Sequence, residues 1–471
     1  MIVFVLCILI LIYAIYLHDK GEKAKSGFIF FIFLTDGFLL LHPEWIENSP
    51  ISKYSDFALL FLGYIWIQRL WSKRDISHLS RAPIFKWFLI LIAYLTFEFI
   101  LTIVLQKEML GFAVKTYRRY LFFLSYVIFI EMSPSQIKRL LVNVSLATFF
   151  TSIIYVTQPI HNLPILSDFV GLETMRIQDN GMARFRNIPK LLYFLLIYAT
   201  IKIDASKLKS LLVLGVMGLS LILTQHRGVM IGYVITIFLY ILMNRKLGKL
   251  VQYTLIGLIA LLLVGDLVFA RFENKGQIST SDDIQTVLHT DYAMAAANGY
   301  DDQGGTLAFR VLLFVERFDY FRNNPQYMLT GVGMRHEDSP KTYKEFDFIL
   351  GSRKIDKETG VWIPQQIDSG DLVWFTPFVK FGFVGLVLYI YITIVMLQFF
   401  YHHRKNGLIP KTAFYYYVLL IVISMKNDML FALIQISFLL MLVVLILKIN
   451  KLNNIGFKKH LNFRLLGRNW M

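Results

Sequence analysis

Apolar runs of helical length, separated by short polar connections, make up most of the chain. One stretch breaks this pattern: residues 271–370 are rich in Asp, Glu, Lys, Arg, Asn and Gly. A straight transmembrane helix needs roughly 20 apolar residues, so several runs must extend into their polar flanks. The pattern predicts an all-α polytopic membrane protein with about thirteen spans (twelve to fourteen) and one large, partly helical periplasmic loop. The predicted spans are Ile2–Leu17, Gly27–Leu41, Phe57–Trp71, Ile84–Leu105, Tyr120–Ile130, Leu140–Val156, Leu191–Ile203, Leu211–Leu223, Val229–Met243, Val251–Phe269, Leu372–Phe400, Ala413–Ile423 and Met429–Leu447.

The composition is that of a membrane protein. The mean hydropathy of +0.56, with 56% hydrophobic and 17% charged residues, excludes a soluble domain of 471 residues. The single cysteine, Cys7, excludes a disulfide framework and a cysteine metal site. The first run lacks a basic leader and a small-residue cleavage site, so we expect a retained helix.

The distribution of Lys and Arg predicts which loops face the cytoplasm. The net charge of +16 comes largely from alternate connections that are rich in Lys and Arg, which is typical of cytoplasmic loops, so we expect no nucleic-acid partner. This alternation places the polar loop and the amino terminus outside the cytoplasm and the carboxyl tail inside. We therefore expect an amino-terminal transmembrane bundle over 1–270, the extracytoplasmic loop with an interfacial helix over 271–370, and transmembrane helices with a basic tail over 371–471.

Two connections on the predicted outer side carry more positive charge than this topology explains. One, 107–119, contains Lys115, Arg118 and Arg119; the other, 157–190, contains several arginines, among them Arg184 and Arg186. An anionic ligand at the outer face would account for them. Salt bridges to nearby carboxylates, or contacts with lipid phosphates, are the alternative.

Two further arginines lie where a lipid diphosphate would be found. Arg227 joins two apolar runs with almost no loop between them, which places it at the membrane interface. Arg310 belongs to the run 306–322, which reads as an amphipathic surface helix with Arg310 and Arg317 on one face. Glu316 stands beside Arg317, so Arg310 is the better ligand candidate. The planar guanidinium binds phosphate with two hydrogen bonds and stays charged. The alternatives are a snorkelling helix-end arginine for Arg227 and a solvated one for Arg310.

Carboxylates supply the candidates for acid–base chemistry. Asp368 and Asp371 precede the helix that leaves the loop, where a carboxylate serves either as a helix cap or as a general base towards a sugar hydroxyl. Asp36 and Glu98 lie within predicted spans, Glu98 the deeper, and such groups face a bundle interior or a buried partner. The sequence contains no metal-ligand spacing, P-loop or nucleotide fingerprint, so we expect neither a metal nor a cofactor.

The order of several short motifs resembles the O-antigen polymerase and O-antigen ligase superfamily of bacterial inner membranes. The family's arginine-glycine helix junction is similar to the segment around Arg227. Its arginine, proline and glycine-x-glycine sequence in the large loop, and the glycine pair of the following helix, also have counterparts. The matching residues are Gln225-His226-Arg227-Gly228, Arg310 with Asn324-Pro325 and Gly331-Val332-Gly333, Phe381-Gly382-Phe383-Val384-Gly385 and, more weakly, Arg184-Phe185-Arg186-Asn187-Ile188-Pro189.

The resemblance implies a glycan transferase that uses a polyprenyl-pyrophosphate-linked oligosaccharide within the lipid bilayer. Ligases of the family carry a histidine about eleven residues before the glycine pair, where this chain has Asp371. That difference favours a repeat-unit polymerase over a ligase, with a chain-length regulator as a further partner. Arg227 and Arg310 would bind the pyrophosphate, Arg184 or Arg186 would add a third contact, and Asp371 or Asp368 would serve the acceptor. A lipid flippase is the alternative from another class; it predicts paired internal repeats, which the sequence lacks.

Overall fold

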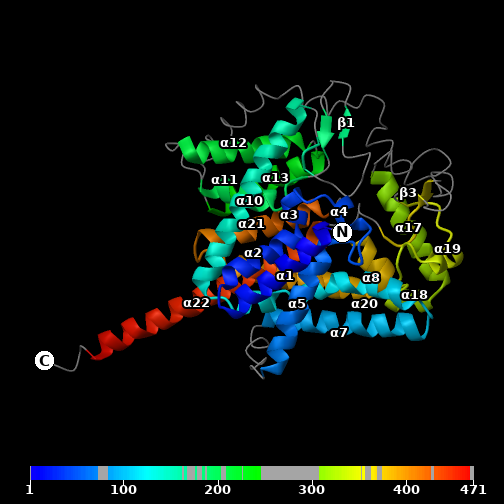
Figure 1. Cartoon of the computed structure of the whole chain (residues 1–471), viewed down its shortest axis with the longest axis horizontal. Coiled ribbons are helices and arrows are strands. Elements are labelled where there is room, and N and C mark those ends of the chain that lie inside the picture. Colours follow the sequence, from blue (N-terminus) through cyan, green and yellow to red (C-terminus); the bar gives the residue numbers. More distant parts are fainter. Residues whose placement is uncertain are drawn as a thin grey trace.

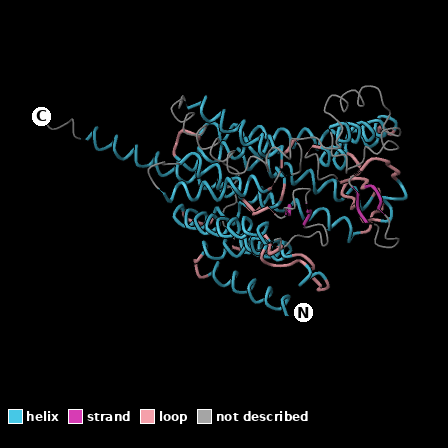
Figure 2. Tube along the Cα trace, turned by 90° about the horizontal axis from the view of Figure 1, so that it is seen from above, coloured by secondary structure: helices cyan, strands magenta, loops and turns pink. Residues whose placement is uncertain are grey.

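The structure, a computed structural model, describes residues 2–72, 83–161, 164–166, 175–177, 183–185, 188–202, 208–224, 226–244, 307–351, 353–355, 362–368, 374–425 and 429–466. Helices dominate these residues, and two antiparallel hairpins supply the strands (Figures 1 and 2). The amino-terminal helices are α1 (Ile2–Asp19), α2 (Lys23–Leu34), α3 (Asp36–Leu39), α4 (Glu44–Glu47), α5 (Tyr54–Trp71), α7 (Pro83–Val104), α8 (Leu110–Tyr120), η1 (Leu121–Leu124), α9 (Tyr126–Ile130) and α10 (Pro134–His161).

The remaining elements run from the first hairpin to the carboxyl end. The strand β1 pairs with β2, and β3 pairs with β4. In chain order the elements are β1 (Met175–Ile177), β2 (Ala183–Phe185), α11 (Leu192–Lys202), α12 (Leu208–Leu223), α13 (Arg227–Asn244), α17 (Leu307–Asn323), α18 (Gln326–Thr330), α19 (Pro340–Glu345), β3 (Arg353–Ile355), β4 (Trp362–Pro364), α20 (Phe375–His403), α21 (Leu408–Ile423), η3 (Met429–Phe431) and α22 (Leu433–Leu466).

The all-α membrane class is confirmed in its main features. Within the described ranges, five helices are long and apolar enough to cross a membrane: Ile2–Asp19, Ile84–Val104, Pro134–Pro159, Phe375–His403 and Leu433–Lys451. Shorter apolar helices, α11, α12, α13 and α21, coincide with further predicted spans. The predicted span at 120–130 is not one regular helix, because it divides into the 3-10 turn η1 and the five-residue α9. The predicted span at 251–269 lies outside the described residues.

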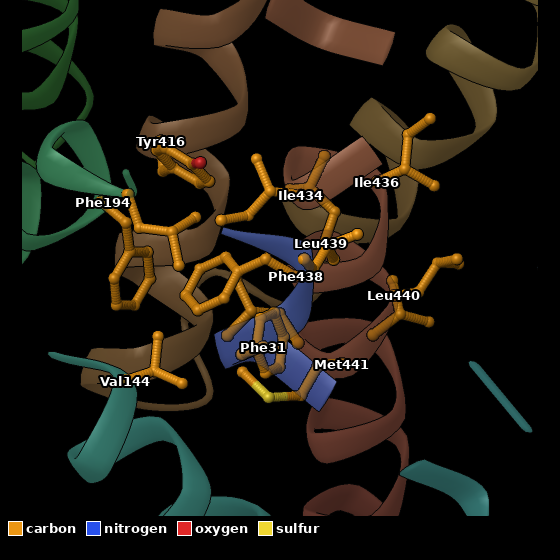
Figure 3. Packing of buried hydrophobic residues seen from close by; sticks show 14 of the residues in the cluster. Phe31, Val144, Phe194, Tyr416, Ile434, Ile436, Phe438, Leu439, Leu440 and Met441 are labelled. Carbon is orange, nitrogen blue, oxygen red and sulfur yellow. The ribbon is translucent and has the colours of Figure 1, made fainter. Parts of the chain in front are cut away.

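The helix α22 lies at the centre of the bundle. Of its apolar window 72% is buried, against 28% for α1, so α22 is surrounded by protein while α1 has the exposure expected beside lipid. Phe438 of α22 packs edge-on against Phe194 of α11, with 4.8 Å between ring centroids, and against Phe31 of α2 at 6.3 Å (Figure 3). Tyr416 of α21 closes this aromatic group. Edge-to-face rings add to the apolar burial that holds the four helices together.

A buried charge cluster ties helix ends together. The carboxylate of Glu131, between α9 and α10, lies 3.3 Å from His18 of α1, 2.7 Å from Lys23 of α2 and 3.7 Å from Arg69 of α5. The Lys448 ammonium of α22 donates to the backbone carbonyls of the neighbouring residues 130 and 132. The hydrogen bond from His18 and the charge of Lys23 lower the pKa of Glu131 to about 2, despite burial. One carboxylate thus links three helices.

The described part of the polar loop forms its own core at one end of the bundle. Figure 1 shows α17, α18, α19 and β3 together at this end, with α8 beside them, while α22 projects from the other end. The helix α17 confirms the predicted helix at 306–322, but its buried apolar side chains are Phe309, Leu312, Leu313 and Phe321. Val315, on the other side of the helix, is exposed. The buried side of α17 packs against the start of α20 and the segment 346–350.

Candidate functional site

An ion pair marks the point where the polar loop enters α20. The Nζ of Lys380 lies 2.7 Å from Oδ1 of Asp368. Lys380 is buried in the second turn of α20, whereas Asp368 is half-buried and ends the described loop segment 362–368. A buried ammonium needs a partner, and the carboxylate supplies it. Asp368 was a candidate from the sequence; its partner Lys380 was not.

Glu337 holds the backbone around Asp368 in place. Its buried carboxylate accepts hydrogen bonds from the backbone N–H groups of Gln366 at 2.6 Å, Ile367 at 2.9 Å and Asp368 at 3.1 Å. The hydroxyl of Tyr343 donates a fourth bond at 2.7 Å. Three successive N–H groups pointing at one carboxylate fix the local backbone, and so fix where the Asp368 side chain starts.

The glycines of the two predicted motifs lie against each other. Gly331 has φ 67° and Gly382 has φ 58°, a conformation that an L side chain rarely adopts. A Cβ on Gly331 would lie 2.4 Å from the carbonyl carbon of Lys380, and one on Gly382 would lie 2.4 Å from the carbonyl of Leu329. Two backbone hydrogen bonds join the segments, from Val332 to Val379 at 2.9 Å and from Gly333 to Lys380 at 2.8 Å. This contact positions Lys380.

The end of α7 supports the same contact. The α20 helix is kinked at Gly382, and the Tyr94 hydroxyl donates to the Phe381 carbonyl at the kink, at 2.9 Å. Further along α7, the Thr102 hydroxyl accepts a hydrogen bond from the backbone N–H of Met334 at 2.8 Å. Glu98, the ionisable residue predicted to lie deep in this span, is buried between them on α7. The loop therefore rests on α7, a helix that is long and apolar enough to cross a membrane and is far away in the sequence.

His336 is a second polar group of the site. Burial and the charge of Lys380 lower the pKa of His336 to about 4, so the imidazole is neutral at pH 7. Its Nδ1 accepts the backbone N–H of Asp338 at 3.1 Å, which leaves the proton on Nε2. The ring stacks on Phe112 of α8, with 5.8 Å between centroids. His336 can therefore donate one hydrogen bond from Nε2.

The electrostatics of Asp368 involve α8 as well. Burial alone would raise the pKa of Asp368, but the charges of Lys380 and Arg119 and the hydrogen bond from Lys380 hold it below its ordinary value. Asp368 is therefore ionised at neutral pH. Arg119 lies at the exposed end of α8 and comes from the connection whose positive charge the topology did not explain. The site thus combines one carboxylate, a buried ammonium, a neutral imidazole and a guanidinium.

Arg310 lies on α17 and is half-buried, whereas Arg317, two turns later, is fully buried. Arg317 is ion-paired with Glu316 and donates to the Gln365 carbonyl at 3.1 Å. The Arg317 guanidinium also lies over the Phe348 ring, 4.2 Å from the ring centroid. These contacts give Arg317 a structural role. The sequence analysis preferred Arg310 to Arg317 as a ligand candidate because Glu316 stands beside Arg317. The structure contains this ion pair between Glu316 and Arg317.

Four candidate residues are described only in part or not at all. Arg227 is the first residue of α13 and Arg184 lies in β2 opposite Arg176, but their side chains are outside the described part of the structure. Arg186 and Asp371 lie outside the described residues altogether. The convergence of Arg227, Arg310 and Asp371 therefore stays a prediction.

The residues that the sequence analysis did not assign are Lys380, His336 and Glu337. Lys380 had a signal, because it is a charge inside an apolar run, two residues before the first glycine of the family's glycine pair. Glu337 and His336 had none, since nothing in a polar loop distinguishes a buried carboxylate or imidazole from a solvated one.

Residues 212–390 match the family model described as O-antigen ligase. No curated protein matches the chain. The matched region runs from α12 into α20 and includes Arg310, Asp368, Lys380 and both contacting glycines, while α7 and α8 lie outside it. The match supports an activity of the polymerase or ligase type on lipid-linked glycans, and it confirms the chain's resemblance to the O-antigen polymerase and ligase superfamily.

Proposed function

We propose that the protein is a polysaccharide repeat-unit polymerase of the bacterial inner membrane. It would transfer a growing glycan from a polyprenyl pyrophosphate to the non-reducing end of a new lipid-linked repeat unit at the outer face. One observation carries the proposal: the contact between Gly331 and Gly382 joins the two family motifs and sets Lys380 against Asp368 at the mouth of the loop. Polar groups at a membrane-facing loop end suit a substrate with a lipid tail and a sugar head.

The proposed reaction needs little from the protein except alignment and charge. The acceptor hydroxyl oxygen attacks the anomeric carbon of the donor glycan, and the bond from that carbon to the diphosphate oxygen breaks. The diphosphate leaves with the bonding electron pair, and the hydroxyl proton passes to the Asp368 carboxylate. Because the diphosphate is already a good leaving group, positioning and electrostatic stabilisation supply most of the rate enhancement.

Each polar group has a separate role in this scheme. Asp368, ionised at neutral pH, accepts the hydrogen bond of the acceptor hydroxyl, with Asp371 as the alternative acceptor. Lys380 fixes the Asp368 carboxylate at 2.7 Å and keeps it charged. Arg310 and Arg227 bind the diphosphate and stabilise the charge that develops on it, and Arg184 or Arg186 adds a contact. Each charge-assisted hydrogen bond is worth about 1.5–3 kcal/mol, so removing one arginine should reduce the rate by about ten- to a hundredfold.

A ligase that moves finished glycan to another acceptor is the second candidate. The absence of a histidine at position 371 counts against it. However, His336 of the loop lies close enough to Asp368 to affect the pKa of its carboxyl. A histidine is thus present in the site, though from a different position in the chain. The two functions differ in their deletion phenotype: loss of a polymerase leaves single repeat units on the final acceptor, and loss of a ligase leaves none.

The experiment is a glycan ladder on a gel from cells that carry single-arginine variants. Arg310→Ala and Arg227→Ala are each expected to reduce chain extension by about ten- to a hundredfold, with unchanged protein level in the membrane. Arg322→Ala is the matched control on α17, because Arg322 is 66% exposed and only reaches Asp319 at 3.5 Å. Normal ladders from both test variants would refute the diphosphate site.

A further inference from the structure

One side of α8 carries more positive charge than the packing of the helix requires. Lys115, Arg118 and Arg119 are separated by three and four residues and so share one face of the helix. Arg118 pairs with Asp56 in the first turn of α5 at 2.6 Å, which brings Lys53, the residue preceding α5, to the same place. Arg118, Arg119 and Lys53 thus act on one carboxylate, Lys115 lies one turn away on the same helix, and an excess of positive charge remains.

The four cations repel one another. Burial, and then the charges of Arg119, Arg118 and Lys115, lower the pKa of Lys53, although Asp56 opposes the shift. Lys115 and Arg119 are exposed. Repulsion of this kind is offset when an anion with several charges binds among the cations.

The adjoining side of α8 is fixed to the site, and Lys115 borders it, with its ammonium 5.2 Å from the centroid of the Phe112 ring. The Thr116 hydroxyl donates to the Arg335 carbonyl at 3.1 Å, and the Phe112 ring stacks on His336. Met109, Leu110 and Val114 at the start of the helix are 56%, 60% and 42% exposed. An amphipathic helix with exposed apolar and basic side chains lies at the level of lipid headgroups. The basic face therefore looks towards phosphate groups while its helix touches the residues around Asp368.

We propose that the basic face of α8, with Lys53, is a second binding site for a lipid-linked diphosphate, separate from the one proposed at Arg310. The inference rests on the proposed function, in which two lipid-linked diphosphates meet in one reaction and each needs its own cations. The guanidiniums of Arg118 and Arg119 offer paired donors, and the ammonium groups of Lys53 and Lys115 offer point charges. Arg119 connects this face to Asp368, because its charge lowers the pKa of that carboxyl.

The test measures binding of farnesyl diphosphate to the full-length protein in phosphatidylcholine nanodiscs by calorimetry. The variant Lys115→Gln/Arg119→Gln changes two exposed side chains, so unaltered thermal unfolding is expected and is checked. Lys344→Gln, an exposed lysine on α19 at the same end of the molecule, is the matched control. We expect the double variant to lose one binding site, or to bind there at least about tenfold more weakly, while Lys344→Gln binds like the wild type.

Two results would overturn the inference. One is unchanged stoichiometry and affinity in the double variant. The other is loss of farnesyl diphosphate from this site when phosphatidylglycerol replaces part of the phosphatidylcholine, which would make the face a headgroup contact.

Arg310→Ala separates the inference from the proposed function. If Arg310→Ala leaves binding intact while the double variant loses a site, the α8 site stands and the Arg310 site fails. If only Arg310→Ala loses a site, the reverse holds.

Discussion

Gly382 offers the sharpest test of how the site is built. An alanine Cβ at this position would lie 2.4 Å from both the carbonyl carbon and the oxygen of Leu329 and 2.7 Å from the Gly331 nitrogen. These are backbone atoms, so no side-chain rotation can relieve the overlap. The backbone at Gly382, with φ 58° and ψ −158°, is also one that only glycine adopts without strain. Gly382→Ala must therefore move the loop away from α20.

The expected loss combines two terms. Backbone strain in this region costs about 1–3 kcal/mol, and overpacking in a tight interior typically adds about 1–3 kcal/mol. Gly382→Ala should therefore destabilise the protein by about 2–6 kcal/mol, the sum of these two ranges. Separation of the segments would also break the hydrogen bonds at Val379 and Lys380 and displace Lys380 from Asp368, so chain extension should be lost as well.

The measurement is thermal unfolding of the purified variant in detergent, followed by intrinsic fluorescence, together with the glycan ladder from cells. Gly215→Ala on α12 is the control, since nothing lies within 4 Å of the Cβ it would add and alanine favours a helix over glycine by up to about 1 kcal/mol. We expect a lower unfolding temperature for Gly382→Ala and an unchanged or higher one for Gly215→Ala. Equal stability and normal ladders in both would show that the close contact is unnecessary.

Two further predictions concern buried charges. Lys380→Met removes the cation that lowers the pKa of Asp368, so the pKa of Asp368 should rise. The acid limb of the pH–activity profile should then move to higher pH, and an unmoved limb would show that Asp368 does not act in catalysis. Adding Asp368→Asn should recover part of the stability lost in Lys380→Met, because a buried charge without its partner costs about 3–5 kcal/mol, but should not recover activity. Glu131→Gln tests the charge cluster: a carboxyl whose pKa falls from 4.5 to about 2 on folding contributes about 3 kcal/mol above its unfolded pKa, and loses this as pH falls towards 2. The difference in unfolding temperature between wild type and Glu131→Gln should therefore be large at pH 7 and shrink below pH 4.5, and a gap independent of pH would contradict this account.

The fold class could be predicted because apolar runs of helical length have few alternatives in a membrane. The boundaries of α1, α7 and α20 lie within a few residues of the predicted spans. The structure of the segment 120–130 could not be predicted in this way, because an apolar run shows no sign that it will divide into η1 and α9. Packing against α22, α7 and α5 stabilises these short turns, and such tertiary contacts leave no periodic trace in the sequence.

The candidate site was predictable where a residue broke a local rule. The positive charge of 107–119 contradicted the topology bias, and this connection does contact the polar loop. The glycines at 331 and 382 were predicted from family motifs, and their mutual contact explains why no side chain fits at either position. The ion pair of Asp368 with Lys380 could not be predicted, because helical spacing relates residues within one helix and says nothing of a loop residue twelve positions away that folds back.

The functional unit is larger than the region that the family match covers. Residues 212–390 contain the loop and the start of α20, but three polar residues, from α7, from α8 and from the connection between them, hold that loop from outside the match. Thr102 binds the N–H of Met334, Thr116 binds the carbonyl of Arg335, and Gln106 binds the Arg335 side chain at 3.1 Å. These contacts determine where Gly333 and His336 lie, and so where His336 stands relative to Asp368. In the proposed transferase the work is therefore divided: the matched region would supply the reacting groups, and the amino-terminal helices would supply the rigid surface that keeps them within reach of one another.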